Sequence, residues 1–227
     1  MALILQIETA TDTCSVSIAK NGVTIATKSD EGARNHAQVL VPNISELLQT
    51  SGIIGEELDA IAVSKGPGSY TGLRIGVSTA KGLCYAWEKP MVAVNTLESM
   101  AAWFASKNRL PIDYFCPMID ARRLEVYTAL FSNVLDTVQE TQALILGANS
   151  FSEQLNQKTI VFFGDGASKF EKLLNQNHNT LFINDFKANS EGMNALALNL
   201  FQENRFESVA YFEPFYLKDF YSPTTPA

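Results

Sequence analysis

Hydrophobic and polar positions alternate along the chain in a way that predicts a mixed α/β protein. Residues 2–8, 13–20 and 23–28 follow the pattern of strands, and Asn21-Gly22 is the dipeptide preferred by a two-residue hairpin turn with positive φ values. Short apolar runs and apolar residues at helical spacing follow. They predict a helix at 37–49, a strand at 60–64, a helix at 72–88, a strand at 91–94 and a helix at 97–106.

The same order of elements begins again after Pro111. We expect strands at 114–119, 124–131, 134–140, 159–163 and 180–183, and helices at 151–156, 168–175 and 190–203. Three meander strands followed by alternating helices and strands are typical of the ribonuclease-H-like half of the actin-like ATPase (ASKHA) fold. The chain is therefore predicted to be an α/β protein of two similar lobes, residues 1–108 and 109–227, and its aromatic tail is expected to pack back on the body.

The amino-acid composition argues against several classes of protein. The 227 residues are 46% hydrophobic and carry a formal charge of −7, which suits a real core and argues against a self-sufficient nucleic-acid binder. No window holds the roughly 18 uninterrupted apolar residues of a membrane span, and the first residues read as a strand and not as a signal peptide. Cys14, Cys84 and Cys116 are widely spaced, as expected of buried thiols in a reducing compartment. We expect a cytoplasmic protein without membrane contact.

A glycine-rich string, Gly-Pro-Gly-Ser-Tyr-Thr-Gly-Leu-Arg-Ile-Gly at 66–76, joins the strand at 60–64 to the next helix. Its spacing is neither that of a Walker loop nor that of a dinucleotide fingerprint. Backbone N–H groups at the helix start could receive an anion or a partner's backbone, or the string could be a tight strand-to-helix connection. The first part of the string is called the signature loop below and consists of Gly66, Pro67, Gly68, Ser69, Tyr70 and Thr71.

Three other stretches are candidates for nucleotide contact. Short side chains at Asp12, Thr13 and Cys14 can leave backbone N–H groups open to phosphate, and Gly164 and Gly166 lie where this superfamily holds adenosine. The string at 120–122, Asp-Ala-Arg, lacks the glycine of a phosphate-binding Asp-x-Gly hairpin, so a bulky side chain stands where phosphate would approach. Ordinary polar turns are the alternative at 12–14 and 164–166. We predict no cofactor beyond weak nucleotide binding.

The sequence lacks the residues that metal binding and nucleophilic catalysis need. The two histidines, His36 and His178, are far apart, and the residue four positions after His36 is Leu40, so a metal-binding pair on one helix face is missing. Neither histidine is placed by sequence to act as a base for Ser69 or Tyr70. We predict no metal and no catalytic residue.

Two of the predicted helices carry candidate contact residues for a partner. Gly72, Gly76 and Ala80 form a narrow face that lets another helix come close, although packing on the chain's own sheet is the alternative. The predicted partner interface consists of His36, Leu40, Ile44, Leu47, Gly72, Leu73, Gly76, Val77 and Ala80.

As a whole, the string at 66–76 resembles the signature of the TsaB (YeaZ) family, the non-peptidase relatives of the glycoprotease-like proteins. Similar strings are Arg34-Asn-His36, Leu40-Val-Pro42, residues 119–127, and Tyr216-Leu-Lys218, which has Lys in place of the family's Arg. The resemblance runs from the first strand to the tail and is strongest before residue 130. It implies a role in making threonylcarbamoyladenosine in tRNA, with the helices at 37–49 and 72–88 as the dimer surface.

The resemblance also implies how such a protein works. It implies a non-catalytic subunit that activates its catalytic relative, TsaD, by dimerising with it, while the ATPase TsaE binds the pair. A homodimer in the absence of TsaD, and tRNA contact only through the complex, belong to the same expectation. Two enzymes remain as alternatives, a small-molecule kinase of the actin-like superfamily and a peptidase acting on its own relative.

Overall fold

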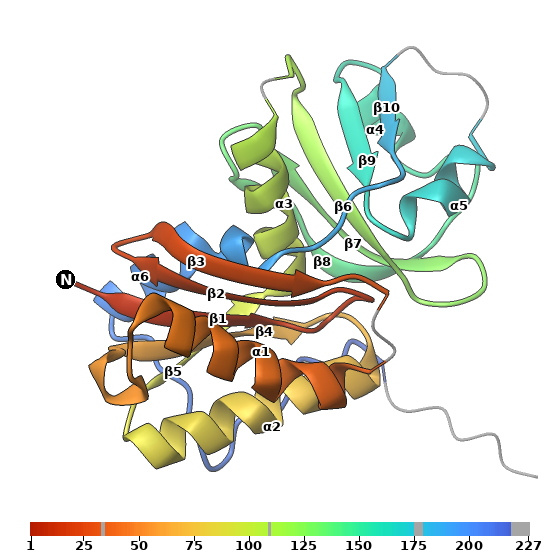
Figure 1. The fold of residues 1–227 in the computed structure, drawn as a ribbon. Helices are drawn as coiled ribbons and strands as arrows, with labels where there is room; N and C mark the ends of the chain where they lie inside the picture. The colour runs from red at the N-terminus through yellow and green to blue at the C-terminus, as the bar shows by residue number, and fades with distance from the viewer. Residues whose placement is uncertain (33–34, 109, 175–178, 219–227) are drawn as a thin grey trace, which may run out of the picture.

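The first lobe is built on a five-stranded sheet (Figure 1). The computed structural model describes residues 1–32, 35–108, 110–174 and 179–218. The sheet has the order β3-β2-β1-β4-β5 and consists of β1 (Leu3–Glu8), β2 (Cys14–Lys20), β3 (Val23–Asp30), β4 (Ala60–Gly66) and β5 (Met91–Asn95). The first three strands are antiparallel, and β4 and β5 continue from β1 in parallel. Asn21 and Gly22 have φ values of 50° and 76°, which confirms the predicted hairpin.

The second lobe repeats this arrangement. Its sheet has the order β10-β9-β6-β7-β8 and consists of β6 (Tyr114–Asp120), β7 (Glu125–Ser132), β8 (Thr137–Ile145), β9 (Ile160–Phe163) and β10 (Thr180–Ile183). The first three of these strands again form an antiparallel meander, and β9 and β10 run parallel to β6. The predicted actin-like α/β fold with two similar lobes is confirmed.

Helices cover both faces of each sheet. On the first sheet, α1 (His36–Ser51) and α2 (Tyr70–Trp87) lie over one face, while a 3₁₀ turn, η2 (Ser190–Met193), and α6 (Asn194–Gln202) lie over the other. On the second sheet, α3 (Thr96–Lys107) covers one face, and the short α4 (Ser152–Leu155) and α5 (Ala167–Glu171) cover the other. A second short 3₁₀ turn, η1 (Gly55–Glu57), precedes β4.

Two of these helices cross the predicted boundary near residue 108. The helix α3 precedes that boundary, yet Phe104 stacks on Phe163 of the second sheet with ring centroids 4.4 Å apart. The helix α6 follows the boundary, yet Ala197 packs with Ile4 and Val92 of the first sheet. Each sheet needs a helix from the other half of the chain to cover an apolar face. The helices α3 and α6 therefore pack across the predicted boundary between 1–108 and 109–227.

All three cysteines are free and buried, as the sequence predicts. None of the helices in the described part of the chain combines the length and the apolar character needed to cross a membrane.

A buried polar strip lies on the α6 face of the first sheet. The hydroxyl of Ser17 donates to Oε1 of Gln6 at 2.8 Å. Glu8, two residues further along β1, is 0% exposed. The backbone N–H of Ala10 donates to its Oε1 at 2.7 Å, whereas its Oε2 has no hydrogen-bond partner within the described residues. Burial raises the pKa of Glu8 to about 7, although the hydrogen bond from Ala10 opposes the shift.

We expect the substitution Glu8→Gln to remove a pH dependence of stability. Because burial raises the folded-state pKa of Glu8 above its unfolded value, the folded chain holds the proton more tightly. Stability is therefore fully present below about pH 4.5 and falls as the pH rises to about 7, by on the order of 3 kcal/mol. Urea unfolding at pH 5 and pH 8 should show a larger loss for the wild type than for the Gln variant. An exposed control, Glu56→Gln, should behave like the wild type. If the free energy of unfolding falls equally from pH 5 to pH 8 in the wild type and in Glu8→Gln, the raised pKa of Glu8 is contradicted.

Candidate functional site

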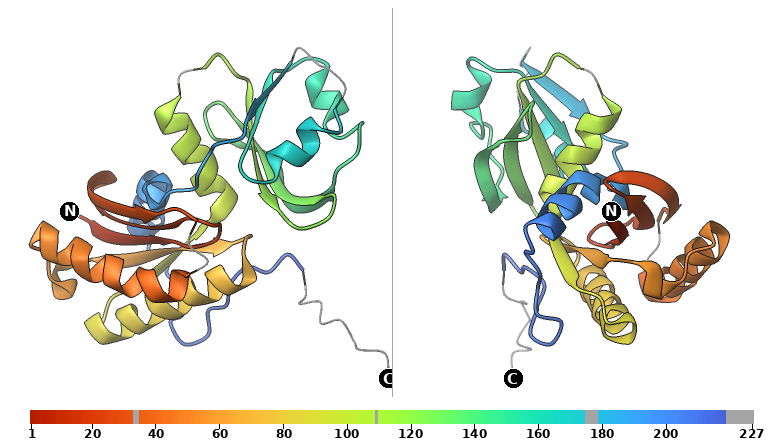
Figure 2. Two further views of the ribbon diagram at one scale, coloured as in Figure 1. Left: turned by 45° about the vertical axis from the view of Figure 1, so that its right-hand side comes forward. Right: turned by 90° about the vertical axis from the view of Figure 1, so that its left-hand side faces the viewer.

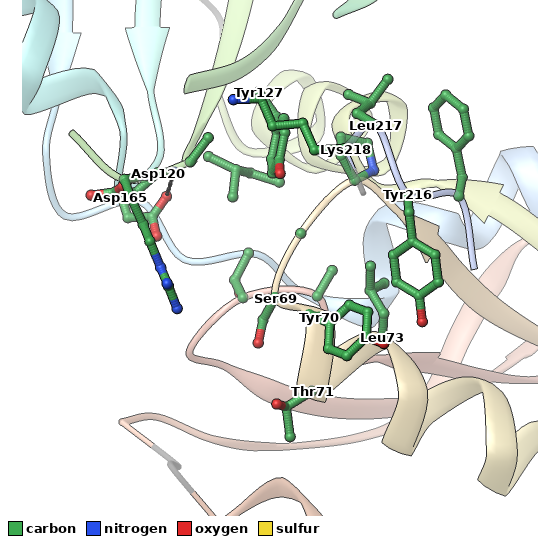
Figure 3. A pocket seen from close by; sticks show the side chains of 18 of the residues that line it. Ser69, Tyr70, Thr71, Leu73, Asp120, Tyr127, Asp165, Tyr216, Leu217 and Lys218 are labelled. Atoms are coloured by element: carbon green, nitrogen blue, oxygen red, sulfur yellow. Dashed lines mark hydrogen bonds between the residues drawn. The ribbon is translucent and has the colours of Figure 1, made fainter. Parts of the chain in front are cut away.

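A cleft of about 450 Å³ opens between the two lobes (Figure 3). The first lobe contributes the β1–β2 hairpin at residues 10–12 and most of the signature loop. The second lobe contributes Asp120, Arg122 and Asp165, and residues 215–218 near the C-terminus form a third wall.

The glycines of the string at 66–76 are required by close contact with the β1–β2 hairpin. A Cβ on Gly72 would lie 2.1 Å from the carbonyl oxygen of Thr9, and one on Gly76 would lie 2.2 Å from its Oγ1. A Cβ on Gly68 would lie 2.3 Å from the carbonyl oxygen of Ala10. The hydroxyl of Thr9 donates to the carbonyl oxygen of Gly72 at 2.9 Å. The geometry therefore favours a tight connection fastened to the hairpin over an open anion-binding turn.

The other polar groups of the signature loop also serve this connection. Ser69 is the N-cap of α2 and accepts a hydrogen bond from the N–H of Gly72 at 3.3 Å. The N–H of Ser69 itself donates to the carbonyl oxygen of Ala10 at 2.7 Å. The ring of His36 does not approach this serine as a base, because its Nε2 lies 2.9 Å from the carbonyl oxygen of Thr11. Arg34 and His178 lie outside the described residues.

In the first predicted phosphate-binding turn, the N–H of Thr13 donates to Oγ1 of Thr11 at 3.4 Å. Just before the turn, the N–H of Thr9 donates to Ser64 and that of Ala10 donates to Glu8. Asp12 is exposed and lines the cleft, but the side chains of Thr13 and Cys14 are buried. Burial, followed by the charges of Asp30 and Glu8, raises the pKa of the Cys14 thiol to about 11. The N–H of Thr13 is therefore already used within the turn, whereas nucleotide contact by Asp12 and Cys14 stays a prediction.

The N–H groups of the second turn, residues 120–122, also donate within the chain. The N–H of Asp120 donates to Asp165 Oδ1 at 2.9 Å, that of Ala121 to the carbonyl oxygen of Glu125 at 3.1 Å, and that of Arg122 to Asp120 Oδ1 at 2.6 Å. Since an N–H group has one hydrogen to donate, these three are already used within the chain. The side chain of Arg122 lines the cleft at the place where the sequence lacks a glycine.

Gly164 and Gly166 are not cleft residues, which corrects their predicted role. A Cβ on Gly164 would lie 2.4 Å from the carbonyl oxygen of Met118, and the N–H of Gly166 donates to that same oxygen at 3.1 Å. Both glycines let the chain turn tightly against β6. Asp165 between them is the residue that reaches the cleft.

Charged side chains of both signs line the cleft, since Arg122 and Lys218 face the same space as three aspartates. Asp12 comes from the first lobe, and Asp120 and Asp165 come from the second. Partial burial raises the pKa of Asp165; the charges of Asp120 and Asp12 add to the shift, and a backbone hydrogen bond from Asp120 opposes it. Among the described residues, no group of three or more His, Cys, Asp or Glu side chains is arranged to hold a metal ion.

The nine residues predicted to face a partner are all buried in this chain. His36, Leu40, Ile44 and Leu47 on α1, and Gly72, Leu73, Gly76, Val77 and Ala80 on α2, point toward the sheet. The periodicity identified one stripe on each helix but could not show that it was the inward one. The outward faces carry Val41, Pro42, Ser45, Ser78, Gly82 and Tyr85, all exposed. A partner that approaches these helices would meet this second set.

The sequence missed most contacts of a C-terminal segment, residues 207–218, which we call the strap. It begins beside β5 through a bridge between Glu207 and Met91, and Lys81 of α2 donates to two of its carbonyl oxygens. Further on, the N–H of Phe215 donates to the carbonyl oxygen of Lys65 at 2.7 Å. The predicted return of the tail to the body is confirmed over these residues. The family-like strings in the loop and the tail were the available signal, but they did not reveal the pairing.

The strap ends across the cleft. Lys218 forms an ion pair with Glu125 of the second lobe, and the rings of Tyr216 and Tyr70 have centroids 5.0 Å apart (Figure 3). Figure 2 shows that α1 and α2 lie side by side below the first sheet, with the strap on the other flank of α2. The strap therefore connects α2 to both lobes.

Solved structures place the chain in the class of proteins with the actin-like ATPase fold. A structure described as "an uncharacterized protein with similarity to peptidase YEAZ from Pseudomonas aeruginosa" superposes with a TM-score of 0.85 at 24% identity, covering 96% of this chain and 100% of that one. Component A of the (R)-2-hydroxyglutaryl-CoA dehydratase of Acidaminococcus fermentans superposes with a TM-score of 0.53 at 10% identity, covering 90% of this chain and 100% of that one.

Sequence comparisons identify the family. Residues 28–222 match the family model TsaD, tRNA N6-adenosine threonylcarbamoyltransferase. The Escherichia coli K12 protein called tRNA threonylcarbamoyladenosine biosynthesis protein TsaB is 33% identical over 224 residues, which are 95% of this chain and 94% of the relative. The chain belongs to the TsaB (YeaZ) family.

We expect Gly72→Ala to destabilise the chain by about 1–3 kcal/mol, because its Cβ would collide with the carbonyl oxygen of Thr9. Gly82→Ala is the matched control on the same helix, since a Cβ there meets nothing within 4 Å. That control should stabilise by about 0.5–1 kcal/mol through helix propensity. Urea unfolding of both variants measures the difference, and equal effects would overturn the explanation of the loop's glycines.

Proposed function

We propose that this chain is a non-catalytic subunit in the formation of threonylcarbamoyladenosine in tRNA. The name of the E. coli relative and the description of the matching family model support that pathway. The observation that carries the non-catalytic role is the state of the two phosphate-binding turns. The N–H groups of Thr13, Asp120, Ala121 and Arg122 donate within the chain, and the side chain of Arg122 lines the cleft where the sequence lacks a glycine. The proposed working surface is then outside the cleft.

The outward faces of α1 and α2 are the proposed surface for a catalytic partner. They are side by side and carry small or apolar exposed residues, of which Val41 is 56% and Tyr85 84% exposed. Because the chain matches the family model of the transferase TsaD itself, we propose that the partner is a TsaD subunit with a similar helix pair. Related chains commonly associate through equivalent faces. A homodimer of this chain alone would use the same surface.

The remaining parts of the proposal follow from this pairing. Binding to this chain shifts TsaD toward its active conformation, which makes the subunit an activator without a reaction of its own. The ATPase TsaE joins the assembled pair. The formal charge of −7 is consistent with tRNA being held by the complex and not by this chain, and the work takes place in the cytoplasm.

The substitution Gly82→Arg tests the surface directly. Arginine keeps the helix propensity of α2, and a Cβ at this position meets nothing within 4 Å, so the fold should survive. We expect size-exclusion chromatography with light scattering to show a one-to-one complex of the wild-type chain with TsaD of the same organism. The variant should bind at least about tenfold more weakly, because a long charged side chain would stand in the contact.

Gly147→Arg is the control for that experiment. It introduces the same side chain at an exposed glycine of the second lobe that also has open space around it. Normal binding by this control, with loss in Gly82→Arg, supports the surface. Equal binding by both variants places the contact elsewhere, and no complex with wild-type chain rejects the partner itself.

Nucleotide binding separates the proposed subunit from a kinase. The N–H groups of residues 120–122 are already used within the chain, and Arg122 stands where a phosphate-binding turn has glycine, so we expect no saturable heat when ATP with Mg²⁺ is titrated into the isolated chain, up to concentrations of about 1 mM. Isothermal titration calorimetry makes this measurement, with an actin-like sugar kinase as the positive control. Stoichiometric binding in the micromolar range would contradict the proposal and favour the kinase alternative.

A further inference from the structure

Arg74 stands out among the exposed residues of α2 because its geometry is fixed from two sides. Its guanidinium carbon lies 4.2 Å from the centroid of the Tyr70 ring, and its Nε donates to the hydroxyl of Tyr216 at 3.2 Å. The Tyr216 ring in turn lies beside that of Tyr70. The helix, the signature loop and the strap thus meet in one stack of a guanidinium and two aromatic rings.

The stack leaves most of the guanidinium available. An arginine has five N–H donors, and Nε uses one of them on Tyr216. In the described part of the chain, no hydrogen bond or ion pair involves the two Nη groups, although Glu213 of the strap attracts the charge at longer range. The other charged residue of α2, Lys81, is already bound to strap carbonyl oxygens.

A guanidinium held in a fixed plane is suited to a planar anion. Two parallel N–H groups match the two oxygens of a carboxylate, and a side chain ordered beforehand loses less entropy when it binds. A phosphate of tRNA is tetrahedral but can also present two oxygens to a guanidinium. It is disfavoured by the formal charge of −7 of the chain. A single carboxylate within a protein surface avoids most of that repulsion.

We propose that Arg74 is a preorganised receptor for an Asp or Glu side chain of the catalytic partner, and that the strap positions it through Tyr216. This inference rests on the proposed pairing through α1 and α2, whose outward face continues into Arg74. The strap then has a role in recognition: it sets the plane of the guanidinium before the partner arrives. Tyr216 is a positioning residue, and Arg74 makes the contact.

The test measures the affinity of full-length variants for fluorescently labelled TsaD of the same organism by anisotropy. We expect Arg74→Ala to weaken binding about tenfold or more and Arg74→Glu to weaken it further, as for a paired charge near an interface centre. Arg74→Lys should recover only a small part, because lysine keeps the charge but not the planar fork. Tyr216→Phe, which keeps the ring and removes the hydroxyl acceptor, should cost about threefold.

A matched control is available in the other lobe. Lys107 lies 4.2 Å from the Trp103 ring centroid, so Lys107→Ala removes a cation–π pair far from α2 and should leave affinity unchanged. The wild-type dissociation constant should rise with salt more steeply than that of Arg74→Ala. Thermal unfolding of each variant shows that the fold is kept.

Several outcomes would overturn the inference. Normal TsaD affinity in Arg74→Ala would refute the proposed carboxylate contact but would leave the proposed pairing through α1 and α2 standing. Equal losses of TsaD affinity in Arg74→Ala and Arg74→Glu, with no change in salt dependence, would show that the stack contributes only packing and no ionic contact. Normal TsaD affinity together with weaker tRNA binding by the Arg74→Ala complex would assign the residue to phosphate. Absence of any wild-type complex would instead reject the proposed function.

Discussion

The approach of the β1–β2 hairpin to the start of α2 is the contact on which the rest of the structure depends. Three glycines, at 68, 72 and 76, bring the backbone and side chain of Thr9 and the backbone of Ala10 to distances that no Cβ could tolerate. The hairpin and the signature loop then exchange hydrogen bonds. This contact fixes α2 against the end of β1, so that one side of the helix closes the core and the other is presented to solvent. The three glycines are needed for this close approach. The glycine-rich string at 66–76 is therefore explained by packing, without a bound anion.

The same contact relates the cleft to the helix surface. In the cleft, the N–H of Thr13 donates to Thr11, and the N–H groups of Asp120 and Arg122 donate to Asp165 and Asp120. On the other side of the signature loop, the strap covers one flank of α2 and orders Arg74 through Tyr216. An actin-like architecture can in this way keep two lobes and a cleft, and the partner surface that we propose lies outside this cleft on a pair of helices. The buried, proton-binding Glu8 beneath the hairpin belongs to the same packed region.

Much of the fold could be predicted from the sequence because its elements are strongly patterned. Asn21-Gly22 specified its hairpin, and the residues predicted for the last strand, 180–183, are those of β10. The sheet that α3 or α6 covers could not be predicted, because periodicity does not say which sheet Phe104 or Ala197 will pack against. The interface residues illustrate the same limit: Leu40 and Val77 mark an apolar stripe, and a stripe buried on its own sheet has the same spacing as one that meets a partner. Arg74 escaped notice because its partner Tyr216 is 142 positions away.

The central claim is that this chain contributes a surface and no chemistry of its own. The most direct measurement is the rate at which TsaD of the same organism modifies tRNA in the presence of threonylcarbamoyl-adenylate, with and without this chain. The account predicts no product from this chain alone, a faster TsaD reaction when the wild-type chain is added, and much less acceleration with Gly82→Arg than with Gly147→Arg. An unchanged TsaD rate, or product formed by this chain without TsaD, would contradict it.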